Sequence, residues 1–343
     1  MKKALLGLLL YLPLALPAFA TETRQLLLDG YYLQAMQQAQ QALQQLPADD
    51  SVGRLRTQID LAKAMMERHQ ADQAEPMFKA LLQDSRQVPP GSLIEAEVQE
   101  GLAGVYLDRQ QPKAAAKLYR RILSIRQKHL GTQHLDVAQT LNDLGVAMGM
   151  QDQMSESEKL LKQALEIREQ LAGHDSFPVA ESLYNLSFNH MVPGQYQLAE
   201  PMMIESIRIK QHVLRPDHPS LTRSMRMLGW LYRKQKRFDE AMAQLQATLA
   251  MTQQNGEDSL DQTGRTLRAI GDCLQDQGKT LEAEQYYRQA LVVLPQALGA
   301  KHPAVGQTMN NLGWLLKTNL RSSEGQQLIT EGQRIMDAAE NQN

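Results

Sequence analysis

The sequence predicts an all-α fold in which two-helix units are stacked one after another. Within residues 137–173, apolar side chains recur every three or four positions on both sides of a short polar turn, as in a pair of amphipathic helices. The same pattern returns at a fixed spacing of 42 residues, without drift. A period of this length is typical of helical repeat arrays. Its most regular column consists of Leu102, Leu144, Leu186, Leu228, Ile270 and Leu312.

Three further columns of the period support the stacking of helices. The residue after the leucine column is small in every copy, as at Ala103, Gly145, Ser187, Gly229, Gly271 and Gly313. Twelve residues later the side chains are again small, at Ala115, Ser157, Ala199, Ala241, Ala283 and Gly325. Four residues beyond these stand the large apolar residues Tyr119, Leu161, Met203, Leu245, Tyr287 and Ile329. Small residues let antiparallel helices approach closely, and the large residue fills the space between them.

These columns resemble the tetratricopeptide repeat, whose pattern is Leu-Gly, then Ala, then a large residue. The 42-residue spacing resembles the longer variety found in kinesin light chains, and the junctions at 215–220 and 299–304 resemble its Gly-x-x-His-Pro sequence. The resemblance covers nearly all of the chain after residue 20. It implies a right-handed superhelical solenoid of helix–turn–helix units, in which the first helix of each unit lines a concave groove.

Residues 1–20 are predicted to be a secretory signal peptide rather than part of the fold. Lys2 and Lys3 precede an apolar run that ends near Leu16, and Ala18-Phe-Ala20 provides a small-x-small cleavage signal. An uncleaved membrane anchor is the alternative, but the run is short for a membrane span and contains proline. We therefore expect cleavage after Ala20 and, from the compact basic region, a protein of the bacterial periplasm.

The repeat pattern divides the mature chain into three parts. Residues 21–50 contain the turn and second helix of a repeat, so we expect an N-terminal capping half-repeat with a truncated first helix. Residues 51–90 form one tetratricopeptide-like unit and end at a Pro-Pro-Gly break. Residues 91–343 hold six units of the 42-residue type and a short C-terminal tail. This last part begins with Ser92 and Glu95, which have the spacing of a capping box.

Composition and motifs argue against several classes of function. The formal net charge is −2, and loss of the two lysines with the signal peptide makes the chain more acidic, which disfavours generic nucleic-acid binding. Cys273 is the only cysteine, so no internal disulfide forms. His134, His218 and His302 share one junction column, which predicts capping or packing rather than metal binding. No zinc motif and no nucleophile–base pair stands out, so we expect no enzyme activity, no metal and no cofactor.

The resemblance places groove residues three and six positions before the small column and one and four positions after it. In the earlier units these positions include the acidic residues Glu97, Glu100 and Glu181. In the last three units they are mainly basic and aromatic, with Asp272 as the acid expected among them. The predicted peptide-binding set is Arg223, Arg226, Trp230, Arg233, Arg265, Arg268, Asn310, Trp314 and Lys317.

The sequence thus predicts a non-enzymatic scaffold or adaptor that binds an extended peptide, with an acidic peptide favoured. Arginine supplies paired donors for carboxylates, and tryptophan supplies contact area. Another interpretation of these residues remains open, in which exposed helix faces simply carry arginines and the tryptophans pack between units. Two alternative functions also remain: a structural or self-associating envelope component that uses its convex face, or a regulatory subunit of an enzyme. Partner identity, pathway and oligomeric state do not follow from the sequence.

Overall fold

The computed structural model describes residues 18–84, 87–254, 259–319 and 321–340. Within these ranges the chain forms sixteen α-helices and no β-strand, which confirms the predicted all-α fold. The chain divides into two compact units, Met1–Pro89 and Pro90–Asn343. Most of the predicted signal peptide, residues 1–17, lies outside the described residues.

The first unit contains two helix pairs, α1 (Ala18–Leu28) with α2 (Tyr32–Gln45), and α3 (Ser51–Glu67) with α4 (Ala71–Gln83). Helix α1 is 11 residues long and packs against both α2 and α3. It begins before the predicted cleavage point after Ala20. The first helix of this pair is therefore short, and it includes the last three residues of the predicted signal peptide.

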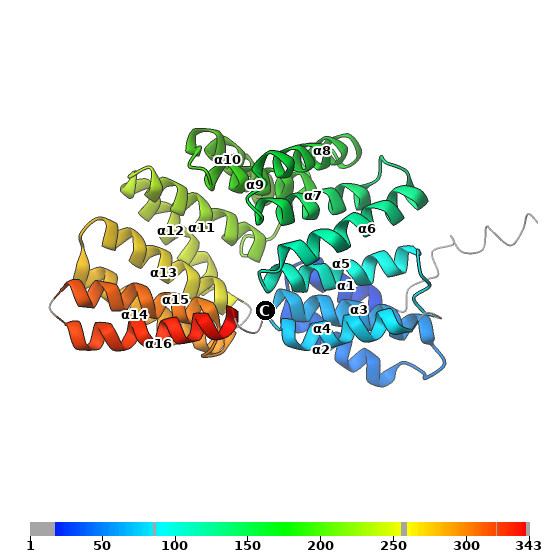
Figure 1. Ribbon diagram of the computed structural model, residues 1–343, viewed down its shortest axis with the longest axis horizontal. Coiled ribbons are helices and arrows are strands. Elements are labelled where there is room, and N and C mark those ends of the chain that lie inside the picture. Colours follow the sequence, from blue (N-terminus) through cyan, green and yellow to red (C-terminus); the bar gives the residue numbers. More distant parts are fainter. Residues whose placement is uncertain (1–17, 85–86, 255–258, 320, 341–343) are drawn as a thin grey trace, which may run out of the picture. The chain divides into compact units, whose positions relative to one another are not determined.

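The second unit consists of six helix pairs, and within it each helix packs mainly against its neighbours in the sequence. In Figure 1, α8, α10 and α12 lie on the outer side of α7, α9 and α11. The helices are α5 (Leu93–Asp108), α6 (Pro112–Leu130), α7 (Leu135–Gly149), α8 (Met154–Ala172), α9 (Phe177–Met191), α10 (Tyr196–Val213), α11 (Pro219–Lys234), α12 (Phe238–Gln253), α13 (Leu260–Asp276), α14 (Thr280–Leu298), α15 (Pro303–Thr318) and α16 (Ser322–Glu340).

The small-residue column allows the two helices of a unit to touch, as predicted. A Cβ atom built on Gly229 would lie 2.7 Å from the side chain of Leu245, the large residue of the same unit. The corresponding atom on Gly271 would lie 2.7 Å from Tyr287. On Gly313 it would meet the backbone carbonyl of Gly325 at the same distance. The helices are therefore too close at these positions for any larger residue to fit without movement.

Helix starts in the second unit follow the capping signals of the sequence. The Ser92 hydroxyl accepts the backbone N–H of Glu95, and the Glu95 carboxylate accepts the N–H of Gly91 in return. His134, His218 and His302 are the N-cap residues of α7, α11 and α15. Each ring accepts the backbone N–H two residues further on, so the predicted capping role of this column is confirmed.

A column of buried cations crosses the junctions between successive helix pairs. Arg126, Arg168 and Lys210 are 42 residues apart on α6, α8 and α10, and each is buried. Arg126 Nη1 donates to a carboxylate oxygen of Glu100 at 2.6 Å, and Lys210 Nζ lies 2.5 Å from a carboxylate oxygen of Glu181. Each acid belongs to the preceding helix of the same pair. Buried charges need such partners, because water no longer solvates them.

Each of these cations also donates to a hydroxyl on the next helix pair. The acceptors are Thr140 Oγ1, Ser182 Oγ and Ser224 Oγ, at 2.8, 2.7 and 2.9 Å from the nitrogen that donates. The hydroxyl column continues at Thr266 and Thr308, although no cation donates to these two in the described residues. One side chain therefore links three successive helices in the first half of this unit.

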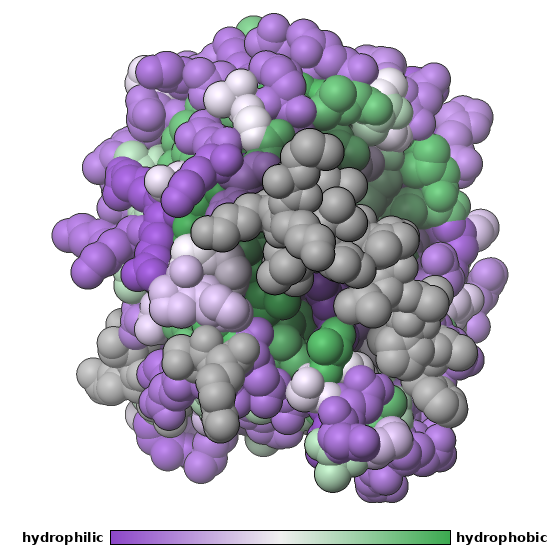
Figure 2. All heavy atoms as spheres, turned by 90° about the vertical axis from the view of Figure 1, so that its right-hand side faces the viewer, coloured by the Kyte–Doolittle hydropathy of each residue, from purple (hydrophilic) through white to green (hydrophobic). Residues whose placement is uncertain are grey.

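Hydrophilic residues occupy most of the surface seen in Figure 2, and smaller hydrophobic areas lie between them. Two aromatic side chains on first helices of the second unit are among the exposed large hydrophobic residues. Phe188 of α9 is 47% exposed and Trp314 of α15 is 54% exposed. Both occupy the position directly after the small column, which the sequence assigns to the groove.

Candidate peptide-binding groove

Helix α11 presents Arg223, Arg226, Trp230 and Arg233 on one face, because these residues are three or four positions apart. The helix begins at Pro219, whose missing N–H is harmless in the first turn, and His218 caps it. On the neighbouring first helix, α13, Arg265 and Arg268 have the same three-residue spacing. Helices α11 and α13 pack against each other, so the two sets of arginines are brought together.

Three of the predicted binding arginines already pair with acids of this chain. Arg223 lies 3.3 Å from Glu181 of α9. Arg233 lies 3.4 Å from Asp272 and 3.5 Å from Asp276 of α13. Arg265 lies 3.9 Å from Asp261, one turn earlier on its own helix. Besides Asp272, the acid expected in the groove columns, these arginines therefore have Glu181 of α9 and the α13 residues Asp261 and Asp276 as partners.

Arg226 and Arg268 differ from the other three, because neither pairs with a carboxylate in the described residues. Arg226 Nη2 donates to the neutral amide oxygen of Gln262 at 3.2 Å, and Arg268 Nη1 donates to that of Gln307. The Nε atoms of both arginines are buried and have no hydrogen-bond partner among the described residues. These two guanidinium groups thus lack a carboxylate partner among the described residues.

The arginines on this face lie close enough to affect one another's pKa. Burial, together with the charges of Arg265 and Arg268, lowers the pKa of Arg226 to about 10. Burial also lowers the pKa of Arg268, against the opposing charge of Asp272. Like charges disfavour each other's charged form only when they are close. The three arginines therefore act as one cluster, which we call the arginine cluster.

The two tryptophans differ in their surroundings although they occupy the same column. Trp230 is partly buried and meets Tyr196 edge-on, with ring centroids 6.2 Å apart. Trp314 is mostly exposed, and the ammonium group of Lys317 lies 5.1 Å from its ring centroid. Trp314 is therefore the tryptophan that offers free contact area, whereas Trp230 also supports the packing of α10 against α11.

Asn310 and Lys317, the remaining predicted site residues, contact the last helix. Asn310 Nδ2 donates to Met336 Sδ at 3.8 Å, while its Oδ1 atom is buried without a hydrogen-bond partner in the described residues. Lys317 Nζ donates to Gln326 Oε1 at 3.1 Å. These contacts tie α15 to α16, so both residues lie at the end of the array and have a structural role there.

Helix α7 carries an acid, Asp143, outside the predicted groove positions. Asp143 of α7 accepts hydrogen bonds from Gln139 and Asn142, which favour its charged form. Burial and the nearby charge of Glu100 outweigh them and raise the pKa of Asp143 to about 6. The predicted groove acids Glu100 and Glu181 pair with the buried cations Arg126 and Lys210.

Comparison with known proteins agrees with this geometry. The model of the tetratricopeptide repeat family matches residues 94–170, 173–254 and 262–324, which is more than half of the chain. The chain belongs to the tetratricopeptide repeat family. No curated protein matches it in sequence.

Two solved structures, both of Rap proteins, show the same helical fold at low sequence identity. A Rap protein in complex with Competence and Sporulation Factor is 14% identical, with a TM-score of 0.64 over 95% of this chain and 98% of that chain. Apo RapI is 14% identical, with a TM-score of 0.60 over 83% of this chain and 99% of that chain. Repeats of a putative kinesin light chain from Podosopora anserina are 22% identical and cover 58% of this chain, with 93% of that chain matched and a TM-score of 0.49.

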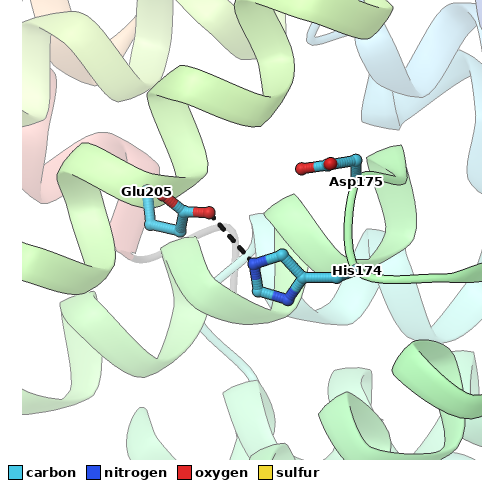
Figure 3. Close-up of side chains that lie close together, drawn as sticks. All are labelled: His174, Asp175 and Glu205. Atoms are coloured by element: carbon cyan, nitrogen blue, oxygen red, sulfur yellow. Dashed lines mark hydrogen bonds and ion pairs between the residues drawn. The ribbon is translucent and has the colours of Figure 1, made fainter.

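One group of side chains in this tetratricopeptide repeat protein resembles a metal site by composition. His174 Nε2 lies 3.0 Å from Glu205 Oε1, and Asp175 lies beside them (Figure 3). However, Arg208 donates hydrogen bonds to both carboxylates and lowers the pKa of Glu205 to about 2. A cation would have to displace this arginine. The group is an exposed ion-pair network that joins the α8–α9 turn to α10.

The buried partner of Glu181 is the functional detail that the repeat pattern alone does not reveal. Glu181 faces the groove and pairs with Arg223, but it also pairs with fully buried Lys210. Burial alone would raise the pKa of Glu181, whereas Lys210 and Arg223 lower it to about 2. A signal existed in the sequence, because Lys210 continues the column of Arg126 and Arg168.

In the described residues, no helix is long and apolar enough to cross a membrane.

Proposed function

We propose that this protein is a non-enzymatic protein–protein interaction scaffold of the bacterial periplasm. It binds an extended peptide that carries acidic side chains across the first helices α9, α11, α13 and α15. The observation that supports this proposal is the state of Arg226 and Arg268. Both guanidinium groups contact only neutral amides, and both keep buried Nε donors without a partner in the described residues.

A carboxylate is the group that fits these donors best. A partly buried cation without an anion is unfavourable, and each added neighbour of the same charge increases the cost. Arginine binds carboxylates through two parallel N–H donors, which gives direction as well as energy. Arg223, Arg233 and Arg265 already have intramolecular acids, so Arg226 and Arg268 are the anchor residues of the proposed site.

The spacing of the anchors defines the partner more closely. Arg226 and Arg268 occupy equivalent positions on α11 and α13, which are packed helices. Packed helices have axes about 8–10 Å apart. A peptide in the extended polyproline II conformation advances roughly 3.1 Å per residue and brings every third side chain back to the same face, so about three residues span that distance. The preferred peptide therefore carries two acidic residues separated by two others, and its apolar side chains lie against Phe188 and Trp314.

Two observations support binding rather than catalysis. Ser220 donates its hydroxyl hydrogen to Glu181 at 2.6 Å, which superficially resembles a nucleophile and its base. The pKa of Glu181 is about 2, so its carboxylate is a poor proton acceptor. Rap, a protein of similar fold, was solved in complex with Competence and Sporulation Factor, which illustrates ligand binding by this architecture.

The direct test compares two 12-residue peptides by fluorescence anisotropy. One carries two glutamates separated by two residues, and the other carries glutamines at the same positions. We expect the glutamate peptide to bind more tightly, and binding to weaken as salt rises. The Arg226→Gln/Arg268→Gln protein should lose about ten-fold or more in affinity, roughly 1.4 kcal/mol. Arg237→Gln, at the N-cap of α12, serves as the control, because Arg237 already binds Glu200 and Glu240.

Equal affinity of the wild type and the double variant, with the fold intact, would move the binding site away from the arginine cluster.

The proposed periplasmic localisation has its own test, which is N-terminal sequencing of the exported protein. A first residue of Thr21 in the periplasmic fraction would support it. Soluble protein that still carries residues 1–20 would contradict it.

A further inference from the structure

The three capping histidines share a chemical requirement that goes beyond peptide binding. His134 Nδ1, His218 Nδ1 and His302 Nδ1 each lie 3.1 Å from the backbone nitrogen two residues further on. A backbone N–H group is always a donor. The Nδ1 atom must therefore be the acceptor in all three cases, and it must carry no proton. The geometry alone fixes the neutral ring with its hydrogen on Nε2.

Protonation of such a ring has two unfavourable effects at once. The Nδ1 atom becomes a donor and cannot accept the N–H of the first turn. The ring also gains a positive charge at a helix N-terminus, where the helix dipole already disfavours cations. Asparagine at the same place accepts the N–H through its side-chain oxygen and does not titrate. A histidine cap is thus a cap that depends on pH, unlike the usual capping residues.

His218 is the member of the column with the most consequence for the groove. Its ring is buried and meets Phe177 of α9 edge-on, with centroids 5.9 Å apart. Its hydrogen-bond partner is Ser220, which also donates its hydroxyl hydrogen to Glu181 at 2.6 Å. Glu181 in turn pairs with Arg223 on the groove face. A short chain of contacts therefore connects the cap of α11 to a side chain of the groove.

The charged groups around this cap come from three helices and one turn. Glu181 stands on α9, Lys210 on α10 and Arg223 on α11, and these three pair with one another through Glu181. In the turn before α11, Arg215 and Asp217 form their own ion pair. Within these contacts, Glu181 and Asp217 each pair with a cation. His134 has Asp136 Oδ2 3.7 Å from its Nδ1 atom and is well exposed.

We infer that His218 is an acid-sensitive cap of α11, which orders the first turn of this helix and the Ser220–Glu181–Arg223 contacts only while its ring is neutral. The contribution of this cap to the order of the first turn of α11 is complete above about pH 6.5, the ordinary titration range of histidine. It decreases as the pH falls below that value, because proton uptake removes the acceptor. The start of the helix that carries Arg223 and Arg226 then becomes less ordered.

Amide hydrogen exchange of the full chain, measured at pH 7.5 and pH 5.5 and corrected for intrinsic rates, tests this inference. We expect exchange in residues 215–225 of the wild type to be at least about three-fold faster at pH 5.5, as expected for local opening. The His218→Asn variant keeps a cap at both pH values and should show no such change. His212→Asn, which removes an exposed histidine of α10, should behave as the wild type.

Equal pH ratios in the wild type and His218→Asn would overturn the inference. If His218→Asn does not fold, the nitrogen chemical shifts of the His218 ring in the wild type provide the second measurement. A neutral ring with its hydrogen on Nε2 at pH 7.5, lost together with exchange protection of the Ser220 amide on acidification, supports the inference. A charged ring at pH 7.5, or a protected Ser220 amide after protonation, contradicts it.

Discussion

The ammonium group of Lys210 lies 2.5 Å from the carboxylate of Glu181, although the two side chains belong to different helices and Lys210 is fully buried. Burial lowers the pKa of Lys210, and the charge of Glu181 opposes that change. The same pairing holds the pKa of Glu181 at about 2. Each group therefore keeps the other charged inside the helix stack.

Lys210→Met should strongly destabilise the protein, because it leaves the charge of Glu181 without its buried partner. Breaking a buried ion pair from one side costs about 3–5 kcal/mol. The double variant Lys210→Met/Glu181→Gln should cost less than the two single changes together. Urea unfolding of the four proteins measures this coupling. Lys162→Met, which removes an exposed lysine paired with Glu158, is the control and should cost at most about 1 kcal/mol. Simple additivity would contradict the prediction.

Acid should weaken the second unit in a defined pH range through Glu181. Its pKa in the folded protein is about 2, below the usual value of 4.5, so the folded state favours the charged form. This contribution is complete above about pH 4.5 and is lost as the pH falls toward 2. Unfolding free energies measured across this range should decline less steeply for Glu181→Gln than for the wild type. Parallel curves would show that Glu181 does not contribute in this way.

Replacement of the two tryptophans should separate binding from packing. Trp314→Ala removes a mostly exposed ring, so we expect weaker binding of the glutamate peptide with less than about 1 kcal/mol change in stability. Trp230→Ala also removes contacts with Tyr196 and the surrounding core, and should lower both binding and stability. Anisotropy titration and urea unfolding measure the two effects. Unchanged affinity of Trp314→Ala would exclude that ring from the site.

Alanine in the small-residue column should destabilise the protein, and more so where its Cβ atom meets backbone than where it meets a side chain. Gly313→Ala places a Cβ atom 2.7 Å from a backbone carbonyl, which has little freedom to move. Gly229→Ala meets the side chain of Leu245, which can shift. We expect both to destabilise by about 1–3 kcal/mol, with Gly313→Ala the worse. Gly104→Ala is the control, because nothing lies within 4 Å of its added Cβ and alanine favours helices by up to about 1 kcal/mol.

The fold follows from the sequence because its determinants repeat. A pair such as Gly229 and Leu245 has the same spacing in every copy, and the structure confirms that the two residues touch. The capping role of His218 was likewise predictable from its junction column. The 42-residue period therefore carries enough information for the helices, their pairing and their starts.

The site was less predictable because its partners lie outside the groove columns. The sequence places Arg233 and Arg265 on the right helices, but Asp276 and Asp261 approach them from positions that the pattern does not assign to the groove. Lys210 is a charged residue in the interior, and only the three-dimensional approach of Glu181 explains it. Side-chain direction across neighbouring helices decides which arginines stay available, and a one-dimensional period does not record it.

The hydroxyl column has a consequence for how such an array changes its length. The hydroxyls of Thr140 and Ser224 accept a hydrogen bond from a cationic side chain of the preceding unit. They also donate a hydrogen bond to a backbone carbonyl of their own helix. Among the described residues, the hydroxyls of Thr266 and Thr308 bond only to their own helix, at 2.7 Å in both cases. The hydroxyl therefore has a hydrogen-bond partner whether or not a cationic side chain donates to it. Duplication or loss of a 42-residue segment during evolution would join units of either kind without leaving this buried oxygen unsatisfied.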